Sequence, residues 1–248
     1  PKVLVLGDSF TEAATVSDGE AYYQWLAAAR PDLEWFAIGG GGYGTLQEYM
    51  LLDEWVDLIK PDLILLQTHP NDLINNSHAL ESRSTSNNNQ MTRPYWEDGR
   101  VVQRFPENPA WGPLYNLVGH SYLMRLLNVN LLFLRSAASS TVEQSLTPDD
   151  PAVVRATETT VQLLAMMRER AHAPVAAFSA RSEDVYRFWS RSETCRRAGV
   201  LFIPGVGDAV DAAVAAGEKV TGLPVDGHWN GRGHAIADLL AIVVRERG

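Results

Sequence analysis

Short apolar runs alternate along the chain with longer segments that have the apolar spacing of helices. Five runs have the length and the β-branched or leucine-rich composition of buried strands, at residues 3–6, 33–37, 63–67, 175–179 and 200–204. Apolar residues recur at helical steps most clearly across residues 153–167 and 236–243. Strands that alternate with helices in this way are typical of βαβ units, so the pattern predicts an α/β fold with a parallel sheet.

Polar residues mark where some of these helices begin. Asp150 followed by Pro151 suits an N-cap and a first-turn proline, and Ser182 followed by two acidic residues suits a second helix start. A third helix is expected to begin near Thr45, after a glycine-rich turn.

Residues 74–149 interrupt this alternation. We predict one domain over residues 1–248 with an insertion at 74–149, in which the polar run at 82–90 is a loop tip and residues 121–134 form a docking helix. Its aromatic residues fit either packing within the insertion or a lid and substrate wall. They are Tyr95, Trp96, Phe105, Trp111, Tyr115 and Tyr122.

Composition narrows the class of protein. A chain of 248 residues that is 46% hydrophobic can bury a core without disulfide or metal staples, and its single cysteine, Cys195, excludes an intrachain disulfide framework and a Cys-based zinc site. With 21 Lys+Arg against 30 Asp+Glu, the net charge is −9, and no basic cluster occurs. This argues against a nucleic-acid partner and favours a small molecule or a neutral polymer.

The sequence was also searched for segments that determine the cellular location. No apolar run approaches the roughly 20 residues that span a bilayer, and no signal-peptide pattern is present. The chain starts at Pro1, directly in an apolar run, so one interpretation is that a targeting segment has been removed.

Candidate chemistry follows the first and third predicted strands, where an open parallel sheet places its ligands. Ser9 stands in the sequence Gly-Asp-Ser-Phe after the first strand, and is either a helix cap or a nucleophile. Asn71 follows the third strand, after His69 and Pro70, and is either a turn residue or an amide donor into the crevice.

A glycine-rich turn at residues 39–44 follows the second strand and exposes backbone N–H groups. Gly39, Gly41 and Gly44 match the GxGxxG spacing of dinucleotide-binding proteins. That fingerprint requires an acidic residue at the end of the next strand. Here Asp62 lies at its beginning, so the sequence argues against a dinucleotide site.

The segment at residues 226–234 precedes the last predicted helix and carries two histidines. Asp226 stands two residues before His228, which is the pairing that a general base needs if a carboxylate is to fix its tautomer. A metal site formed by Asp226, His228 and His234 is an alternative, although no further ligands of matching spacing stand nearby.

Taken in order, these segments resemble the SGNH hydrolase superfamily, also called GDSL esterases and lipases. The resemblance covers nearly the whole chain except the insertion, and it implies a three-layer α/β/α sandwich around a roughly five-stranded parallel sheet. It further implies that Ser9 is the nucleophile, His228 the base and Asp226 the acid, with an oxyanion hole formed by Ser9, Gly42 and Asn71. No metal or organic cofactor is implied.

Three positions depart from the usual pattern of the superfamily. Ala37 stands where asparagine is usual, His69 replaces the glycine that usually stands two residues before the oxyanion-hole asparagine, and Asp226 lies two rather than three residues before His228. The two-residue spacing is similar to that of members that act on acetyl groups of polysaccharides.

These features lead to three hypotheses for function. The first is an ester hydrolase that removes short acyl groups, such as acetyl, from a carbohydrate or similar alcohol. The second is an O-acyltransferase that passes the same acyl group to a glycan, and the third is a carbohydrate-binding module with impaired catalysis. The resemblance to exported bacterial proteins favours an extracytoplasmic location.

Overall fold

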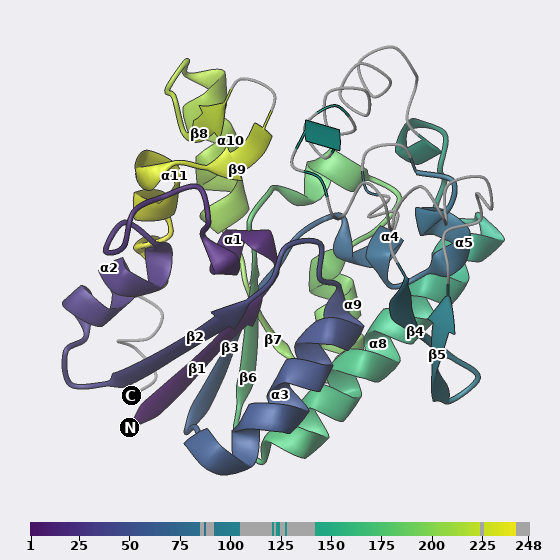
Figure 1. The fold of residues 1–248 in the computed structure, drawn as a ribbon, viewed down its shortest axis with the longest axis horizontal. Coiled ribbons are helices and arrows are strands. Elements are labelled where there is room, and N and C mark those ends of the chain that lie inside the picture. Colours follow the sequence, from purple (N-terminus) through teal and green to yellow (C-terminus); the bar gives the residue numbers. More distant parts are fainter. Residues whose placement is uncertain are drawn as a thin grey trace.

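Five parallel strands form the central sheet of the computed structural model, which describes residues 1–84, 87, 92–104, 121, 123–124, 127, 142–223 and 226–241 (Figure 1). The spatial order is β2-β1-β3-β6-β7. All five predicted strands are confirmed. They are β1 Lys2–Gly7, β2 Glu34–Gly39, β3 Leu63–Thr68, β6 Val175–Ser179 and β7 Leu201–Ile203.

Helices cover both faces of this sheet, because its strands are apolar on both sides. Val3 and Val5 of β1 pack in one core with α2 (Tyr22–Ala29) and α10 (Val206–Ala215), and that core also includes residues next to α11 (Gly231–Ile236). Leu4 and Leu6 pack on the opposite face with α3 (Thr45–Ile59), α8 (Pro151–Ala171) and α9 (Arg191–Ala198). The result is the predicted three-layer α/β/α sandwich.

The helix starts follow the predicted capping residues. The Asp150 side chain accepts a hydrogen bond from the backbone N–H of Ala152, with Pro151 in the first turn of α8. Ser182 caps the short 3-10 helix η2 (Glu183–Tyr186) in the same way, through the N–H of Asp184. The helix expected across residues 236–243 is only partly described: α11 ends at Ile236, and residues 242–248 lie outside the described part of the chain.

The predicted insertion contains a β-hairpin that the sequence pattern did not predict. Strands β4 (Arg93–Glu97) and β5 (Arg100–Arg104) pair antiparallel across Asp98 and Gly99, both of which have positive φ angles. An Asp-Gly pair is a strong signal for such a two-residue hairpin turn, so the signal was present in the sequence.

The remaining short elements flank this hairpin or lie near the ends of the sheet strands. They are α1 (Ser9–Glu12), α4 (Asp72–Asn75), α5 (His78–Glu81), η1 (Val142–Gln144), β8 (Thr221–Leu223) and β9 (Asp226–Trp229). The docking helix expected at 121–134 and the aromatic residues Phe105, Trp111, Tyr115 and Tyr122 fall on or among residues outside the described part of the chain.

The prediction of a loop tip at 82–90 is wrong for Ser84, one of the residues of this run that the structure describes. Ser84 is buried, and its hydroxyl contacts the carboxylate of Glu143. Asn87 donates from its side-chain amide to Glu143 and to the hydroxyl of Tyr186. Hydrogen bonds that satisfy polar groups in the interior therefore hold this part of the run against the core.

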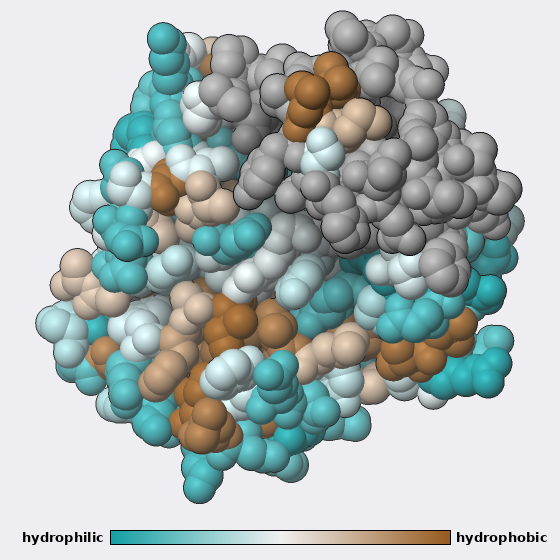
Figure 2. Space-filling model, viewed as in Figure 1, coloured by the Kyte–Doolittle hydropathy of each residue, from teal (hydrophilic) through white to brown (hydrophobic). Residues whose placement is uncertain are grey.

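On the face shown in Figure 2, most of the described surface is hydrophilic or mixed. Figure 2 shows apolar side chains gathered at the lower centre of one face, in the region where α3 lies in Figure 1. Met50 and Leu58 of this helix are both exposed. Among the described residues, no helix is both long and apolar enough to cross a membrane.

Candidate active site

The candidate site lies at the carboxyl ends of β1 and β3, which are neighbours in the sheet. In a sheet of this order the crevice between these two strands is the switch point where ligands bind. Ser9 follows β1, and Asn71 follows β3. The topology therefore places two of the predicted residues at one edge of the sheet.

The hydroxyl of Ser9 does not cap the helix, because its neighbour Asp8 does. Asp8 is the N-cap of α1, and its carboxylate accepts from the backbone N–H of Phe10 at 2.9 Å. Ser9 Oγ instead lies 2.7 Å from Nε2 of His228, across 219 positions of sequence. Of the two interpretations of Ser9, the structure excludes the helix cap.

The tight approach at this turn explains Gly7. A Cβ at this position would lie 2.3 Å from Thr11 Oγ1 and 2.5 Å from Gln67 Oε1. Those two groups are hydrogen bonded to each other, and Gln67 also accepts from the N–H of Asp8. The glycine therefore lets β1 turn sharply into α1 while β3 holds the turn.

His228 reaches Ser9 from a two-stranded sheet outside the central one, in which β9 pairs antiparallel with β8. The backbone carbonyl of the next residue, Trp229, accepts from Thr15 Oγ1 at 3.0 Å, and the side chain of Asn230 caps α11. Asp226 opens β9 two residues before His228, and its side chain lies outside the described part of the structure.

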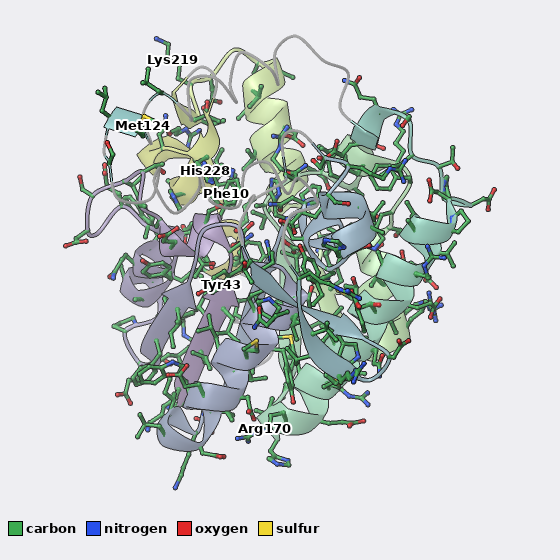
Figure 3. All side chains as sticks on the ribbon, turned by 45° about the vertical axis from the view of Figure 1, so that its right-hand side comes forward. Phe10, Tyr43, Met124, Arg170, Lys219 and His228 are labelled. Atoms are coloured by element: carbon green, nitrogen blue, oxygen red, sulfur yellow. The ribbon has the colours of Figure 1, made fainter. Side chains whose placement is uncertain are left out.

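Phe10 packs against both histidines of the site. Its ring centroid lies 5.0 Å from that of His69, in a stacked arrangement, and 5.2 Å from that of His228, in a tilted one. Figure 3 shows Phe10 and His228 next to each other, with Arg170 at the opposite end of the molecule. A buried aromatic ring thus fixes the spacing between the two imidazoles.

Asn71 occupies the N-cap position of α4 without using its side chain as a cap. Its Oδ1 lies 2.5 Å from Nδ1 of His69. The backbone N–H of His69 in turn donates to Asp72 at 2.8 Å. Asn71 and His69 both line the same pocket as Ser9 and His228.

Gly42 lies in the same pocket, and a residue of the insertion donates a hydrogen bond to it. Its φ of +72° is in the left-handed region that favours glycine. Its carbonyl oxygen accepts from Arg93 of β4 at 2.8 Å. Arg93 is buried and also pairs with the buried Glu81 at 3.3 Å. Sequence patterns gave no indication that a hairpin residue holds this turn.

The pocket around Ser9 has a volume of about 530 Å³. Much of its lining can exchange hydrogen bonds with a polyhydroxy ligand, including the amides Asn71, Asn75 and Asn87 and the guanidinium of Arg181. Asn87 belongs to the insertion, so this segment contributes to the pocket wall. Apolar lining comes mainly from Phe10 and Ala14.

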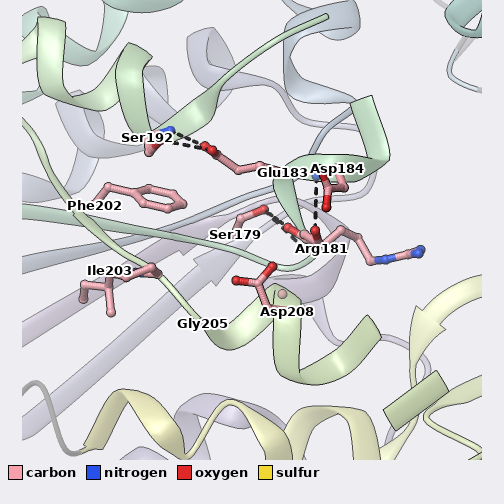
Figure 4. A pocket seen from close by; sticks show the side chains of 12 residues that line it. Ser179, Arg181, Glu183, Asp184, Ser192, Phe202, Ile203, Gly205 and Asp208 are labelled. Carbon is pink, nitrogen blue, oxygen red and sulfur yellow. Dashed lines mark hydrogen bonds between the residues drawn. The ribbon is translucent and has the colours of Figure 1, made fainter. Parts of the chain in front are cut away.

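Two further hollows adjoin this pocket. One of about 350 Å³ shares Gly41 and Gly42 with it and is lined mainly by α3 and β4. The other, of about 410 Å³, shares Arg181 and carries the carboxylates of Glu183, Asp184 and Asp208. Figure 4 shows that the guanidinium of Arg181 extends away from Phe202 and Ile203 in this second hollow.

Three carboxyl groups are buried next to one another close to the site, and sequence patterns did not single them out. Burial raises the pKa of Asp8 to about 6, although hydrogen bonds and nearby His228 oppose the rise. Burial also raises the pKa of Glu48 and of Asp72 well above their ordinary values, and the mutual repulsion of the carboxylates adds to both rises. A carboxyl environment of this kind favours the protonated acid.

His234, considered above as a metal ligand, serves the core instead. It is buried, its Nδ1 accepts from the backbone N–H of Tyr22 at 3.2 Å, and its ring stacks on that of Tyr22. Burial lowers its pKa to about 4. Within the described residues, no group of three or more His, Cys, Asp or Glu side chains is arranged to hold a metal ion.

The glycines that suggested a dinucleotide site have a packing explanation. A Cβ at Gly39 would lie 2.6 Å from the backbone nitrogen of Glu12, and one at Gly44 would lie 2.8 Å from Asn76 Oδ1. The turn follows β2, which is the edge strand and not one of the two strands at the switch point.

Comparison with solved structures identifies the fold. The chain superposes over its whole length on a lipolytic protein of the G-D-S-L family from Veillonella parvula, with a TM-score of 0.56, 13% identity and 99% of that chain covered. The chain has the fold of the SGNH hydrolases. Esterase EstA from Pseudoalteromonas shares it, with a TM-score of 0.53, 12% identity and coverage of 99% of this chain and 97% of that one.

A third similar structure is a variant of Axe2, an acetyl-xylooligosaccharide esterase from Geobacillus. It matches with a TM-score of 0.50 and 15% identity, covering all 100% of this chain and 94% of the other. Scans against protein-family models and against curated proteins find no match to this sequence.

Proposed function

We propose that the protein is a serine ester hydrolase that works through an acyl-enzyme intermediate on Ser9. The observation that carries the proposal is the 2.7 Å contact between Ser9 Oγ and His228 Nε2 at the switch point of the sheet. A serine hydroxyl is a weak nucleophile at neutral pH, and an imidazole within hydrogen-bond reach is the usual means of activating it. The SGNH fold supports the same chemistry.

In the proposed acylation, His228 takes the hydroxyl proton as Ser9 Oγ forms a bond to the ester carbonyl carbon. His228 then gives that proton to the leaving alcohol oxygen as the ester C–O bond breaks. In deacylation, water attacks the acyl carbon, its proton passes to His228, and the proton returns to Ser9 Oγ as the carboxylic acid leaves. Asp226 is the acid that we expect to orient His228.

The negative charge on the intermediate needs donors, and three groups of the pocket are assigned to this role. They are the backbone N–H of Ser9, the backbone N–H of Gly42 and the side-chain amide of Asn71. All three residues line the pocket in which the ester would bind. Loss of one such donor typically lowers kcat by about 100- to 1,000-fold.

The proposed substrate is a short acyl ester, such as an acetate, of a carbohydrate or similar alcohol. The amides of Asn71, Asn75 and Asn87 supply hydrogen-bonding groups that suit sugar hydroxyls. Axe2, which shares the fold, is an esterase of acetylated xylooligosaccharides. Both observations favour a carbohydrate ester over a long-chain lipid.

Hydrolysis of p-nitrophenyl acetate tests the nucleophile and the base. We expect turnover by the purified chain to fall by at least about 1,000-fold in Ser9→Ala and in His228→Ala. Ser17→Ala, an exposed serine of the same region, is the matched control and retains full activity. A serine-directed phosphonate should add its mass to Ser9. Turnover that survives in Ser9→Ala, or an adduct at another residue, contradicts the proposal.

The acyl group and the fate of the acyl-enzyme are tested with a series of p-nitrophenyl esters from acetate to octanoate. We expect kcat/KM to be highest for acetate and to fall with chain length, because amide and guanidinium groups line the pocket around Ser9 beside Phe10 and Ala14. A preference for octanoate would refute the short-acyl assignment. Acetylated sugar formed from an added acceptor would point to acyl transfer, and binding of glycan without turnover would point to a binding module.

A further inference from the structure

We propose that His69 is a positioning residue, whose Nδ1–H holds the oxygen of the Asn71 amide so that the amide NH₂ faces the oxyanion. The inference rests on the proposed function, and it concerns a residue that departs from the usual glycine of the superfamily. It predicts that the side chain at position 69 acts on the rate of the chemical step through Asn71.

Two groups of Asn71 lie within hydrogen-bond distance of His69 Nδ1, and we assign the donor from the shorter contact. The Asn71 Oδ1 lies 2.5 Å from this ring atom, and the backbone N–H of Asn71 points to it from 3.3 Å. An amide oxygen can only accept a hydrogen bond, so the shorter contact needs a proton on Nδ1, and in that tautomer Nδ1 does not accept from the backbone N–H of Asn71. We therefore assign His69 as the Nδ1–H tautomer.

The imidazole is itself held in place from three sides. Its ring stacks on Phe10 with an interplanar angle of 21°, its backbone N–H is bonded to Asp72, and Pro70 follows it in the chain. Its pKa is lowered to about 3 because burial disfavours the cation and because Arg181 and Arg191 lie nearby, although the hydrogen bond with Asn71 opposes the fall. The ring is therefore neutral across the working pH range and offers one fixed donor.

Without this contact the Asn71 amide has no other anchor among the hydrogen bonds of the described residues. As the N-cap of α4 it makes no side-chain capping bond. An amide that turns about its last side-chain bond presents its oxygen to the pocket as readily as its NH₂, and an oxygen would repel the oxyanion. Donors stabilise a transition state efficiently only when they already point at the developing charge.

Two substitutions separate the hydrogen bond of His69 from its packing. His69→Phe keeps a ring that can stack on Phe10 but removes the donor, whereas His69→Asn loses the ring but places an amide N–H close to the position of Nδ1. We expect His69→Phe to lower kcat for p-nitrophenyl acetate by about 10-fold or more with KM within twofold. His69→Asn should recover most of that loss. Equal losses in both variants would mean that packing alone matters.

A double-mutant cycle tests whether His69 acts through Asn71. In an Asn71→Ala background, His69→Phe should cause less than a twofold further loss of kcat, because the amide that it orients is gone. If the fold-losses of kcat in the two single variants multiply in the double variant, the proposal is wrong. If wild-type turnover depends on Ser9 and His228 while His69→Phe is fully active, the inference fails and the proposed function stands. If Ser9→Ala retains activity, the proposed function itself fails.

The tautomer is measured on the wild-type chain, and a variant serves only to assign the signal. Long-range ¹⁵N–¹H spectra of the ¹⁵N-histidine-labelled chain, with His69 assigned by its disappearance in His69→Asn, should show a neutral ring that is protonated at Nδ1. Protonation at Nε2 would make Nδ1 an acceptor and reverse the proposed contact. Because this readout needs no turnover, it holds even if a variant folds poorly.

Discussion

Asp8, Glu48 and Asp72 show how single buried residues couple protonation to stability near the site. Each is almost completely buried, and each has a pKa raised above its ordinary value because burial disfavours the anion. The folded chain therefore holds these protons more tightly than the unfolded chain. Their contribution to stability is complete below about pH 4 and declines as the pH rises, for Asp8 between about pH 4 and pH 6.

Glu48→Gln removes one of these carboxyls without touching the proposed catalytic groups. We expect the melting temperature of this variant, relative to the wild type, to rise progressively between pH 4 and pH 8. Glu54→Gln, on an exposed position of the same helix, is the control and should show a flat difference. Thermal unfolding followed by circular dichroism measures both. If the difference in melting temperature between Glu48→Gln and the wild type does not change with pH, the Glu48 carboxyl does not contribute to the pH dependence of stability.

At the residue scale, the sequence predicted which residues lie in the pocket better than it predicted the contacts between their side chains. Ser9, Asn71 and His228 were singled out because they follow strands or stand in recognisable motifs, and the structure brings all three to one pocket. The contact of His69 with Asn71 could not be predicted, since it depends on the side-chain rotamers at the turn into α4. The roles of Gly42 and Asp226 stay predictions.

At the scale of elements, hairpin β4–β5 is tied to the turn that carries Gly42. Arg93 donates to the Gly42 carbonyl at 2.8 Å and to Gln47 Oε1 at 2.7 Å. Its partner Glu81 also accepts from the hydroxyl of Tyr95 at 3.0 Å. A buried network of this kind stabilises the fold only if each polar group has a partner, because every buried group without one costs free energy. The hairpin is thus part of the wall that shapes the proposed oxyanion hole.

Arg93→Ala tests this connection. Breaking a buried ion pair leaves Glu81 without its charged partner, so we expect the free energy of unfolding to fall by about 3–5 kcal/mol. We also expect a lower kcat for p-nitrophenyl acetate, because the Gly42 turn loses its support. Arg104→Ala removes an exposed ion pair of the same hairpin and should change stability by less than about 1 kcal/mol. Urea denaturation measures the free energy of unfolding of both variants, and equal decreases in the two would contradict the prediction.

For the whole molecule, the alternation of apolar strands and helices was enough to predict the layers. Each βαβ unit buries a strand on both faces, so its apolar run is continuous and easily recognised. The short elements outside the central sheet were missed because they bury less apolar surface and are held by polar contacts. Strand β9 is one of them: the sequence pattern did not predict a strand around His228, yet this segment pairs with β8.

The long separation of Ser9 and His228 has a consequence for how the protein is made. The first 227 residues include every strand of the central sheet and the serine itself. In a nascent chain these strands are therefore made before the imidazole of His228 can lie beside Ser9. Only when residue 228 has emerged and β9 has paired with β8 does the hydroxyl gain its partner, so we expect a truncated or stalled polypeptide to lack the proposed Ser9–His228 pair.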